Sequence, residues 1–149
     1  MGDNEEKILF QLFQDEDDWP PFSVESIWSA KLESHVYRLN NVPYFAKNIS
    51  LGDVIRTQEI DGQEWFLEVQ KESANSTVHV FCFDKVKRDN LQTWAKLNHC
   101  TWEYAFKQQY IALSIPPDVP KVTWIAKLNE LESLDDDGLE YEVSALRHA

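Results

Sequence analysis

The stretch Thr77-Val78-His79-Val80-Phe81-Cys82-Phe83 decides the fold of the second half of the chain. Its apolar residues fall on both faces of an extended strand, which is typical of a buried strand at the centre of a sheet. Asp84 follows at once and favours the N-cap of a helix, which we predict to run to about Asn98. The apolar stripe of this helix consists of Val86, Leu91, Trp94, Ala95 and Leu97.

Downstream of this helix, the pattern predicts two strands, a second helix and a last strand. The two strands run from Thr101 to Phe106 and from Tyr110 to Ile115, and Pro116-Pro117-Asp118 ends the sheet and starts the helix. The alternation of Leu139, Tyr141 and Val143 indicates the last strand. The order β-α-β-β-α-β predicts a ferredoxin-like unit over residues 73–149.

Upstream, residues 8–70 indicate five or six short antiparallel strands. Asp61-Gly62 is the strongest hairpin signal and predicts a type I′ turn, whereas Trp19-Pro20-Pro21 excludes a central strand. We expect residues 1–72 to form a small antiparallel β-sheet or partial barrel. The predicted class is therefore α+β, with two halves, 1–72 and 73–149, that form one compact unit sharing a core.

Charge limits the partners of the protein. The 149 residues include 26 Asp and Glu but 14 Lys and Arg, which leaves a net charge of -12 with the histidines neutral. This excess disfavours nucleic acid and anionic membranes as partners. No apolar run reaches the length of a membrane span, and two cysteines are too few for a disulfide framework, so we expect a cytoplasmic monomer or weak dimer.

No catalytic, metal-binding or phosphate-binding signature is present. The four histidines are scattered over different predicted elements, and Cys82 lies in an apolar strand that disfavours its thiolate. We therefore predict no catalytic residue, no metal and no cofactor, and no enzymatic activity. An unrecognised enzyme would require His79, His35 or a pair of carboxylates to converge in one cleft.

The acidic residues are concentrated in two segments. Residues 1–18 carry seven acids and one base, and residues 130–142 carry seven acids and no base, whereas residues 84–121 have six bases against four acids. The two segments are either solvated loops that prevent aggregation or a negative surface for a basic partner. The predicted partner-binding residues are Asp15, Glu16, Asp17, Asp18, Asp135, Asp136, Asp137, Glu140 and Glu142.

Several short segments resemble, in order and spacing, a bacterial family described as a domain of unknown function, the DUF4265-like family. These segments are Trp19-Pro20-Pro21, Glu25-Ser26-Ile27-Trp28, Tyr37 to Ala46, Gly52-Asp53-Val54 and Ser76-Thr77-Val78. The most specific is Asn41-Val42-Pro43-Tyr44-Phe45-Ala46, in which the family usually has Phe at the position of Tyr44. The family also favours an Arg near the position of His79.

The resemblance implies no established reaction, but it suggests a biological setting. Proteins of this type look like those encoded beside polymorphic toxins. A compact acidic protein would there be an immunity or inhibitor protein that binds a cognate, basic toxin encoded by an adjacent gene and occludes its active site. The alternative is a regulatory or small-ligand-binding domain without catalysis, with a pocket of Tyr37, Asn41, Tyr44 and Phe45.

Overall fold

The computed structural model describes residues 5–132 and 138–149. It divides the chain into two compact units, Met1–Ser73 and Ala74–Ala149. The first unit contains β1 (Glu5–Gln11), β2 (Val24–Glu33), β3 (Val36–Leu39), β4 (Val54–Ile60) and β5 (Gln63–Lys71). The second contains β6 (Ser76–Cys82), α1 (Lys85–Leu97), β7 (Thr101–Ala105), β8 (Tyr110–Ile115), α2 (Lys121–Glu132) and β9 (Leu139–Ala145).

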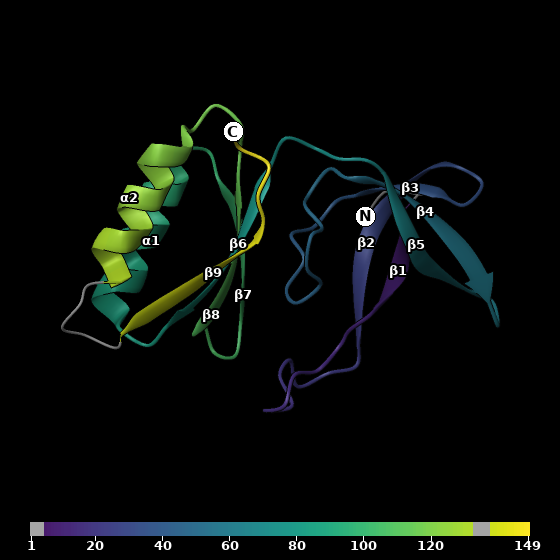
Figure 1. Cartoon of the computed structure of the whole chain (residues 1–149), viewed down its shortest axis with the longest axis horizontal. Coiled ribbons are helices and arrows are strands. Elements are labelled where there is room, and N and C mark those ends of the chain that lie inside the picture. Colours follow the sequence, from purple (N-terminus) through teal and green to yellow (C-terminus); the bar gives the residue numbers. More distant parts are fainter. Residues whose placement is uncertain (1–4, 133–137) are drawn as a thin grey trace. The chain divides into compact units, whose positions relative to one another are not determined.

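The first unit is a closed barrel with the strand order β1-β2-β3-β4-β5 (Figure 1). Its consecutive strands pair antiparallel, and a parallel pairing of β1 with β5, which places Leu9 beside Trp65, closes it. The sheet therefore closes completely, where the sequence predicted a small sheet or a partial barrel. Register shifts between Lys31 and Glu33 and between Arg56 and Thr57 bend the strands, which is how bulges help a small sheet to close.

The interior of the barrel follows from the alternation along its strands. Ile8 and Phe10 of β1 are buried, as are Ile27 of β2 and Ile55 of β4. Every second residue of a strand points to the same face, so these side chains line the inside. The turn between β4 and β5 is confirmed as the predicted hairpin, because Asp61 (φ 51°) and Gly62 (φ 81°) both have the positive φ that a type I′ turn requires.

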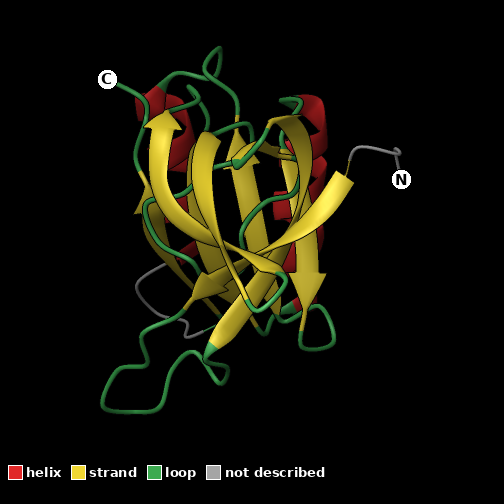
Figure 2. Ribbon diagram, turned by 90° about the vertical axis from the view of Figure 1, so that its right-hand side faces the viewer, coloured by secondary structure: helices red, strands yellow, loops and turns green. Residues whose placement is uncertain are grey.

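The second unit is a four-stranded antiparallel sheet with the order β7-β8-β6-β9. Both helices of the described residues lie side by side on one face of this sheet (Figures 1 and 2). The central position predicted for the Thr77–Phe83 stretch is confirmed, because β6 has neighbours on both sides and its residues 76–80 are all buried. The mixed α+β class is confirmed as well.

The two helices cover the sheet with a few buried side chains. Leu91 and Ala95 of α1, with Trp124 and Leu128 of α2, join the core formed by the sheet. Asp84 caps α1 as predicted, and its Oδ1 accepts hydrogen bonds from the backbone N–H groups of residues 86 (2.8 Å) and 87 (3.2 Å). The predicted apolar stripe was wrong at its ends: Val86 and Leu97 are 76% and 74% exposed. The helix turns these two side chains away from the sheet.

Each unit has a hydrophobic cluster formed by its own residues. The expectation that the two halves share one core stays a prediction. No helix in the described parts of the chain is long and apolar enough to cross a membrane.

Candidate partner-binding loop

The strongest candidate for a binding surface is the connection between β1 and β2, residues 12–23, which we call the acidic loop. Asp15 organises it, because its Oδ1 accepts hydrogen bonds from the backbone N–H groups of Asp17 (2.8 Å) and Trp19 (3.0 Å). The backbone N–H of Asp15 donates in turn to the carbonyl oxygen of Trp19 (2.8 Å). The acidic loop therefore has a defined shape that depends on one of its own carboxylates.

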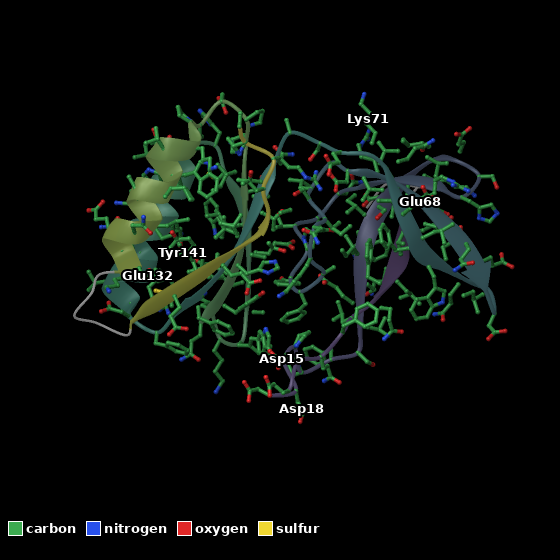
Figure 3. The ribbon with its side chains drawn as sticks, in the orientation of Figure 1. Asp15, Asp18, Glu68, Lys71, Glu132 and Tyr141 are labelled. Atoms are coloured by element: carbon green, nitrogen blue, oxygen red, sulfur yellow. The ribbon has the colours of Figure 1, made fainter. Side chains whose placement is uncertain are left out.

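The acidic loop exposes both aromatic rings and carboxylates. Phe13 is 87% exposed and Phe22 is 51% exposed. The acidic residues 16–18 are exposed as well. Figure 3 shows Asp15 and Asp18 on a part of the loop that projects beyond the strands of the barrel. Aromatic rings that a partner can bury, beside charges that attract it, are typical of a protein interface.

Aromatic packing supports the acidic loop on the barrel. The rings of Trp19 and Phe22 pack around Phe45, with centroid distances of 5.6 and 5.8 Å. Phe45 belongs to the segment of residues 40–46, which carries the most specific part of the family resemblance. Phe45, one of the residues that carry the family resemblance, therefore helps to hold the acidic loop in place.

The buried carboxylate of Glu25 on β2 holds this segment. It accepts hydrogen bonds from three successive backbone N–H groups, those of Tyr44 (2.6 Å), Phe45 (2.9 Å) and Ala46 (2.9 Å). Hydrogen bonds to an ionised acceptor are about twice as strong as those between neutral groups. Glu25 therefore fixes the backbone that carries Phe45.

The four residues predicted to line a ligand pocket lie at different positions along the barrel. Tyr44 and Phe45 lie at the end where Glu25 is located, and Asn41 is half-buried in the same connection. Tyr37 is buried inside the barrel, where its hydroxyl donates to Oε2 of Glu6 (2.9 Å). Burial, and then the hydrogen bond with Glu6, raises the pKa of Tyr37 well above its ordinary value. Phe45 packs against the hydrophobic cluster to which Tyr37 belongs, and the predicted pocket stays a prediction.

The second predicted acidic segment is described in part. Glu140 and Glu142 lie on the edge strand β9, beside Phe81 and His79 of β6. Both are exposed. Residues 135–137 lie outside the described residues. The predicted contribution of this segment to partner binding stays a prediction.

The thiols of the second unit are not activated. Cys82 and Cys100 are free and buried. Burial raises the pKa of Cys82, and burial followed by the charge of Asp118 raises the pKa of Cys100 to about 12. Thiols that remain protonated at neutral pH are poor nucleophiles and poor metal ligands.

A serine–histidine pair joins β6 to the C-terminal segment, and no pattern in the sequence predicts it. Nδ1 of His148 lies 2.6 Å from Oγ of Ser76, and its Nε2 lies 2.9 Å from the carbonyl oxygen of Pro116. A carbonyl oxygen only accepts, so Nε2 donates and Nδ1 accepts from the serine. Ser76 is fully buried, and the backbone N–H of Arg147 donates to its Oγ (2.9 Å). This pair fastens the C-terminal segment to β6 and presents no accessible nucleophile.

A shallow depression of about 440 Å³ lies between the helices of the second unit. It is lined by Asp89, Asn90, Thr93, Trp94, Leu97 and Lys127. None of the residues predicted to form a pocket contributes to it. Within residues 5–132 and 138–149, no three His, Cys, Asp or Glu side chains come together in a way that could hold a metal ion.

The sequence holds an unused signal for two features of this region, the outward position of Phe13 and the inward position of Glu25. Ile8 and Phe10 face the barrel, so the alternation of β1, continued past its end, places Phe13 on the outer side. Glu25 lies two residues before the buried Ile27, and the same alternation turns its carboxylate inward. A carboxylate at an inward position requires donors, and here the backbone of residues 44–46 supplies them.

The fold and the site define an α+β protein with a preorganised acidic and aromatic surface. The chain belongs to the DUF4265 family, a domain of unknown function, whose model matches residues 25–140. The fold is similar to that of a solved structure described as a novel crystal structure of a hypothetical protein from Neisseria gonorrhoeae. The TM-score is 0.76 and the identity 19%, over 95% of this chain and 96% of that one. The search of curated proteins found no match.

Proposed function

We propose that the protein is a bacterial immunity or inhibitor protein that binds a cognate, basic toxin and occludes its active site. The acidic loop carries the proposal. It exposes Phe13 and Phe22 beside residues 16–18, and internal hydrogen bonds together with the packing on Phe45 hold it in one shape. A loop that is ordered before binding loses less conformational entropy when the partner binds.

The two kinds of side chain contribute differently to such an interface. Exposed carboxylates attract a basic surface over a distance and raise the rate of encounter. Exposed aromatic rings contribute after contact, because they bury a large apolar area at a low cost in side-chain entropy. Residues 16–18 are expected to act on the association rate, and Phe13 on the dissociation rate.

We also infer the fold family and the compartment of the protein. The order β6-α1-β7-β8-α2-β9 and the strand order β7-β8-β6-β9 support a ferredoxin-like second unit. The free, buried Cys82 and Cys100 support a reducing compartment, the cytoplasm. An immunity protein located there would act on toxin that enters or is made in the same cell.

The test is co-expression with the protein encoded by the adjacent gene. The intact chain should protect cells against that protein and bind it in a pull-down and by surface plasmon resonance. Phe13→Ala and the double variant Asp17→Asn/Asp18→Asn should each weaken binding, the first through faster dissociation and the second through slower association.

A matched control is Asp89→Asn, which removes an exposed charge from α1 in the second unit, outside both acidic segments. It should bind and protect like the intact chain. The proposal fails if the adjacent protein neither binds nor is neutralised. The assignment to the acidic loop fails if the loop variants bind as tightly as Asp89→Asn.

A second candidate function, binding of a small ligand, is favoured by one observation. A cluster of titratable side chains occupies the other end of the barrel, around Tyr37 and Glu64, away from the acidic loop.

A further inference from the structure

Polar side chains from all parts of the barrel wall meet at the end where β1 begins, which we call the Tyr37 end. The acidic loop follows the last residue of β1, so the two features lie at opposite ends of the barrel. The side chains of the Tyr37 end are those of Glu6 on β1, Lys31 on β2, His35 in the turn after β2, Tyr37 on β3, Thr57 on β4 and Glu64 on β5.

The alternation of the strands directs those of these side chains that lie on strands to the interior face. Glu6 lies two residues before the buried Ile8, and Thr57 two residues after the buried Ile55. Tyr37 belongs to the core itself. The interior of the barrel is thus apolar in its middle and polar at the Tyr37 end. The mouth of a small barrel is a common place for a ligand site, in which a few polar groups converge above an apolar interior.

Hydrogen bonds join the cluster in two groups. The hydroxyl of Tyr37 donates to Oε2 of Glu6 (2.9 Å). Oε1 of Glu64 accepts from Oγ1 of Thr57 (2.6 Å) and lies 2.8 Å from Nδ1 of His35. The side chain of Glu64 is 12% exposed and that of His35 is 53% exposed. Glu64 is therefore largely desolvated, whereas Glu6 and His35 are exposed, so a ligand can reach the cluster from solvent.

Glu6, Glu64 and His35 each have one side-chain atom that is not used in these hydrogen bonds. Among the described residues, Oε1 of Glu6, Oε2 of Glu64 and Nε2 of His35 form no hydrogen bond. In the neutral tautomer of His35 that donates from Nδ1 to Glu64, Nε2 presents a lone pair. Two carboxylate oxygens, joined by Nε2 of His35 when its ring is neutral, are available as acceptors at the same end of the barrel.

The charge of the cluster is not balanced by its own residues. Lys31 is exposed, and within the described residues it forms no ion pair, although its charge helps to lower the pKa of Glu64. Both Glu6 and Glu64 raise the pKa of the buried Tyr37, after burial itself, so both carboxylates act on the same small volume. Two carboxylates near one phenol favour a bound cation.

We propose that the Tyr37 end of the barrel binds a guanidinium group through Glu6, Glu64 and His35. A guanidinium has five N–H donors in a planar fork and no acceptor, so it can donate to the free carboxylate oxygens of Glu6 and Glu64 at the same time. It is also hydrated more weakly than an ammonium, so it loses less on entering a partly buried site. The group can belong to a free small molecule or to an arginine side chain of a protein. This inference rests on the second candidate function and is independent of toxin binding.

The test is a calorimetric titration of the full chain with four ligands: L-arginine, a Gly-Arg-Gly peptide blocked at both ends, L-lysine and the corresponding blocked Gly-Lys-Gly peptide. We expect a guanidinium ligand to bind and its lysine counterpart to bind more weakly. NMR shifts of the His35 and Tyr37 rings should change on binding. Free arginine as the better ligand identifies a small molecule, and the blocked peptide as the better ligand identifies a protein side chain; either result supports the proposal.

Substitutions locate the site. Glu6→Gln and Glu64→Gln keep an acceptor for Tyr37 and for Thr57, but each should weaken binding about tenfold or more, as expected for the loss of a charge-assisted hydrogen bond. Lys31→Ala removes the competing cation and should strengthen binding. Glu68→Gln is the matched control, because Glu68 (Figure 3) lies on the same strand as Glu64 but is 54% exposed and paired with Arg56.

The proposal is overturned if no guanidinium ligand binds, or if arginine and lysine ligands bind equally. It is also overturned if Glu6→Gln/Glu64→Gln, folded by circular dichroism, binds like Glu68→Gln. If the double variant does not fold, Lys31→Ala decides: unchanged or weaker binding overturns the proposal. Protection against the toxin is measured separately, and these variants should not change it, so failure of one proposal leaves the other intact.

Discussion

Three carboxylates of the first unit are largely removed from solvent, and donors from distant parts of the sequence stabilise each of them. Glu25 accepts three backbone N–H groups of residues 44–46. Asp53, which is fully buried, accepts the N–H of Ser50 (2.9 Å) and that of Ser73 (2.8 Å). Glu64 accepts from a threonine and a histidine. Burying a carboxylate without such partners would be strongly unfavourable, so each one specifies the position of a loop or turn.

The substitution Glu25→Gln tests whether this carboxylate holds residues 44–46, on which the acidic loop packs. The carbonyl oxygen of glutamine can replace one acceptor, but its NH2 group would face N–H donors. We expect a loss of roughly 1.5–3 kcal/mol in the free energy of unfolding, the range for hydrogen bonds to charged groups. Urea unfolding measures it, with the exposed Glu130→Gln as the control that should leave stability nearly unchanged. Equal unfolding midpoints of the two variants would show that Glu25 does not hold the loop.

Glu64 should make stability depend on acid pH. Burial opposes its ionisation, but the hydrogen bonds from Thr57 and His35 outweigh burial and hold the pKa of Glu64 below its ordinary 4.5. A carboxyl whose pKa is lowered by folding stabilises the protein above its unfolded pKa, and this stabilisation is lost as the pH falls through the folded pKa.

Below about pH 5 the intact chain should therefore lose stability more steeply than Glu64→Gln, which has no carboxyl to protonate. Urea unfolding at a series of pH values between neutral and acid measures both slopes. Parallel curves for the two proteins would contradict the lowered pKa.

Among the elements, α1 shows how a local signal defines a boundary. Asp84 combines an extended backbone with a side chain that accepts from the first turn, so the helix begins directly after the central strand β6. The first four N–H groups of a helix have no partner within it, and this cap satisfies two of them. The helix then packs Leu91 and Ala95 on the sheet.

Asp84→Ala should lower the free energy of unfolding by about 1 kcal/mol, the usual loss when an N-cap is removed. The control is Asp89→Ala on the same helix, which removes only the exposed ion pair with Lys85 (2.7 Å) and should have little effect. Thermal unfolding of both variants measures the difference. A melting temperature for Asp84→Ala as high as that of Asp89→Ala would contradict the capping role.

The whole molecule carries a net charge of -12, and its acidic residues gather in a few places. In the first unit they include the acidic loop, whose residues 16–18 are exposed, and the Tyr37 end, where two carboxylates share one buried phenol. In the second unit the charged residues of α1 are mainly basic, while the acidic Glu140 and Glu142 lie on β9. Exposed charges that are grouped in this way act mainly on the rate of encounter with a partner, since salt screens exposed charges over about 8–10 Å.

Salt should therefore slow the association of the protein with its basic partner and change the dissociation rate little. The double variant Asp17→Asn/Asp18→Asn should show a smaller salt dependence of the association rate than the intact chain. Stopped-flow kinetics at several ionic strengths measures both. Equal salt dependence in the two proteins would remove the acidic loop from the electrostatic part of the interface.

Much of the fold could be predicted because its signals are local. The run from Thr77 to Phe83 defined a central strand, Asp84 a helix start, and Asp61-Gly62 a type I′ turn. The candidate site was predicted less completely: the pattern indicated that residues 15–18 are accessible, but it did not indicate that Asp15 holds the loop together or that Phe13 and Phe22 are exposed.

The sequence by itself determined the order of strands and helices, since periodicity, caps and turn residues act over a few neighbouring positions. Only the tertiary structure decided that the first sheet closes, that Glu25 holds residues 44–46, and that Glu6, His35 and Glu64 meet at one end of the barrel. These contacts join residues about 20 or more positions apart. They depend on strand register and bulges, which one strand's pattern cannot specify because register is a property of the pair.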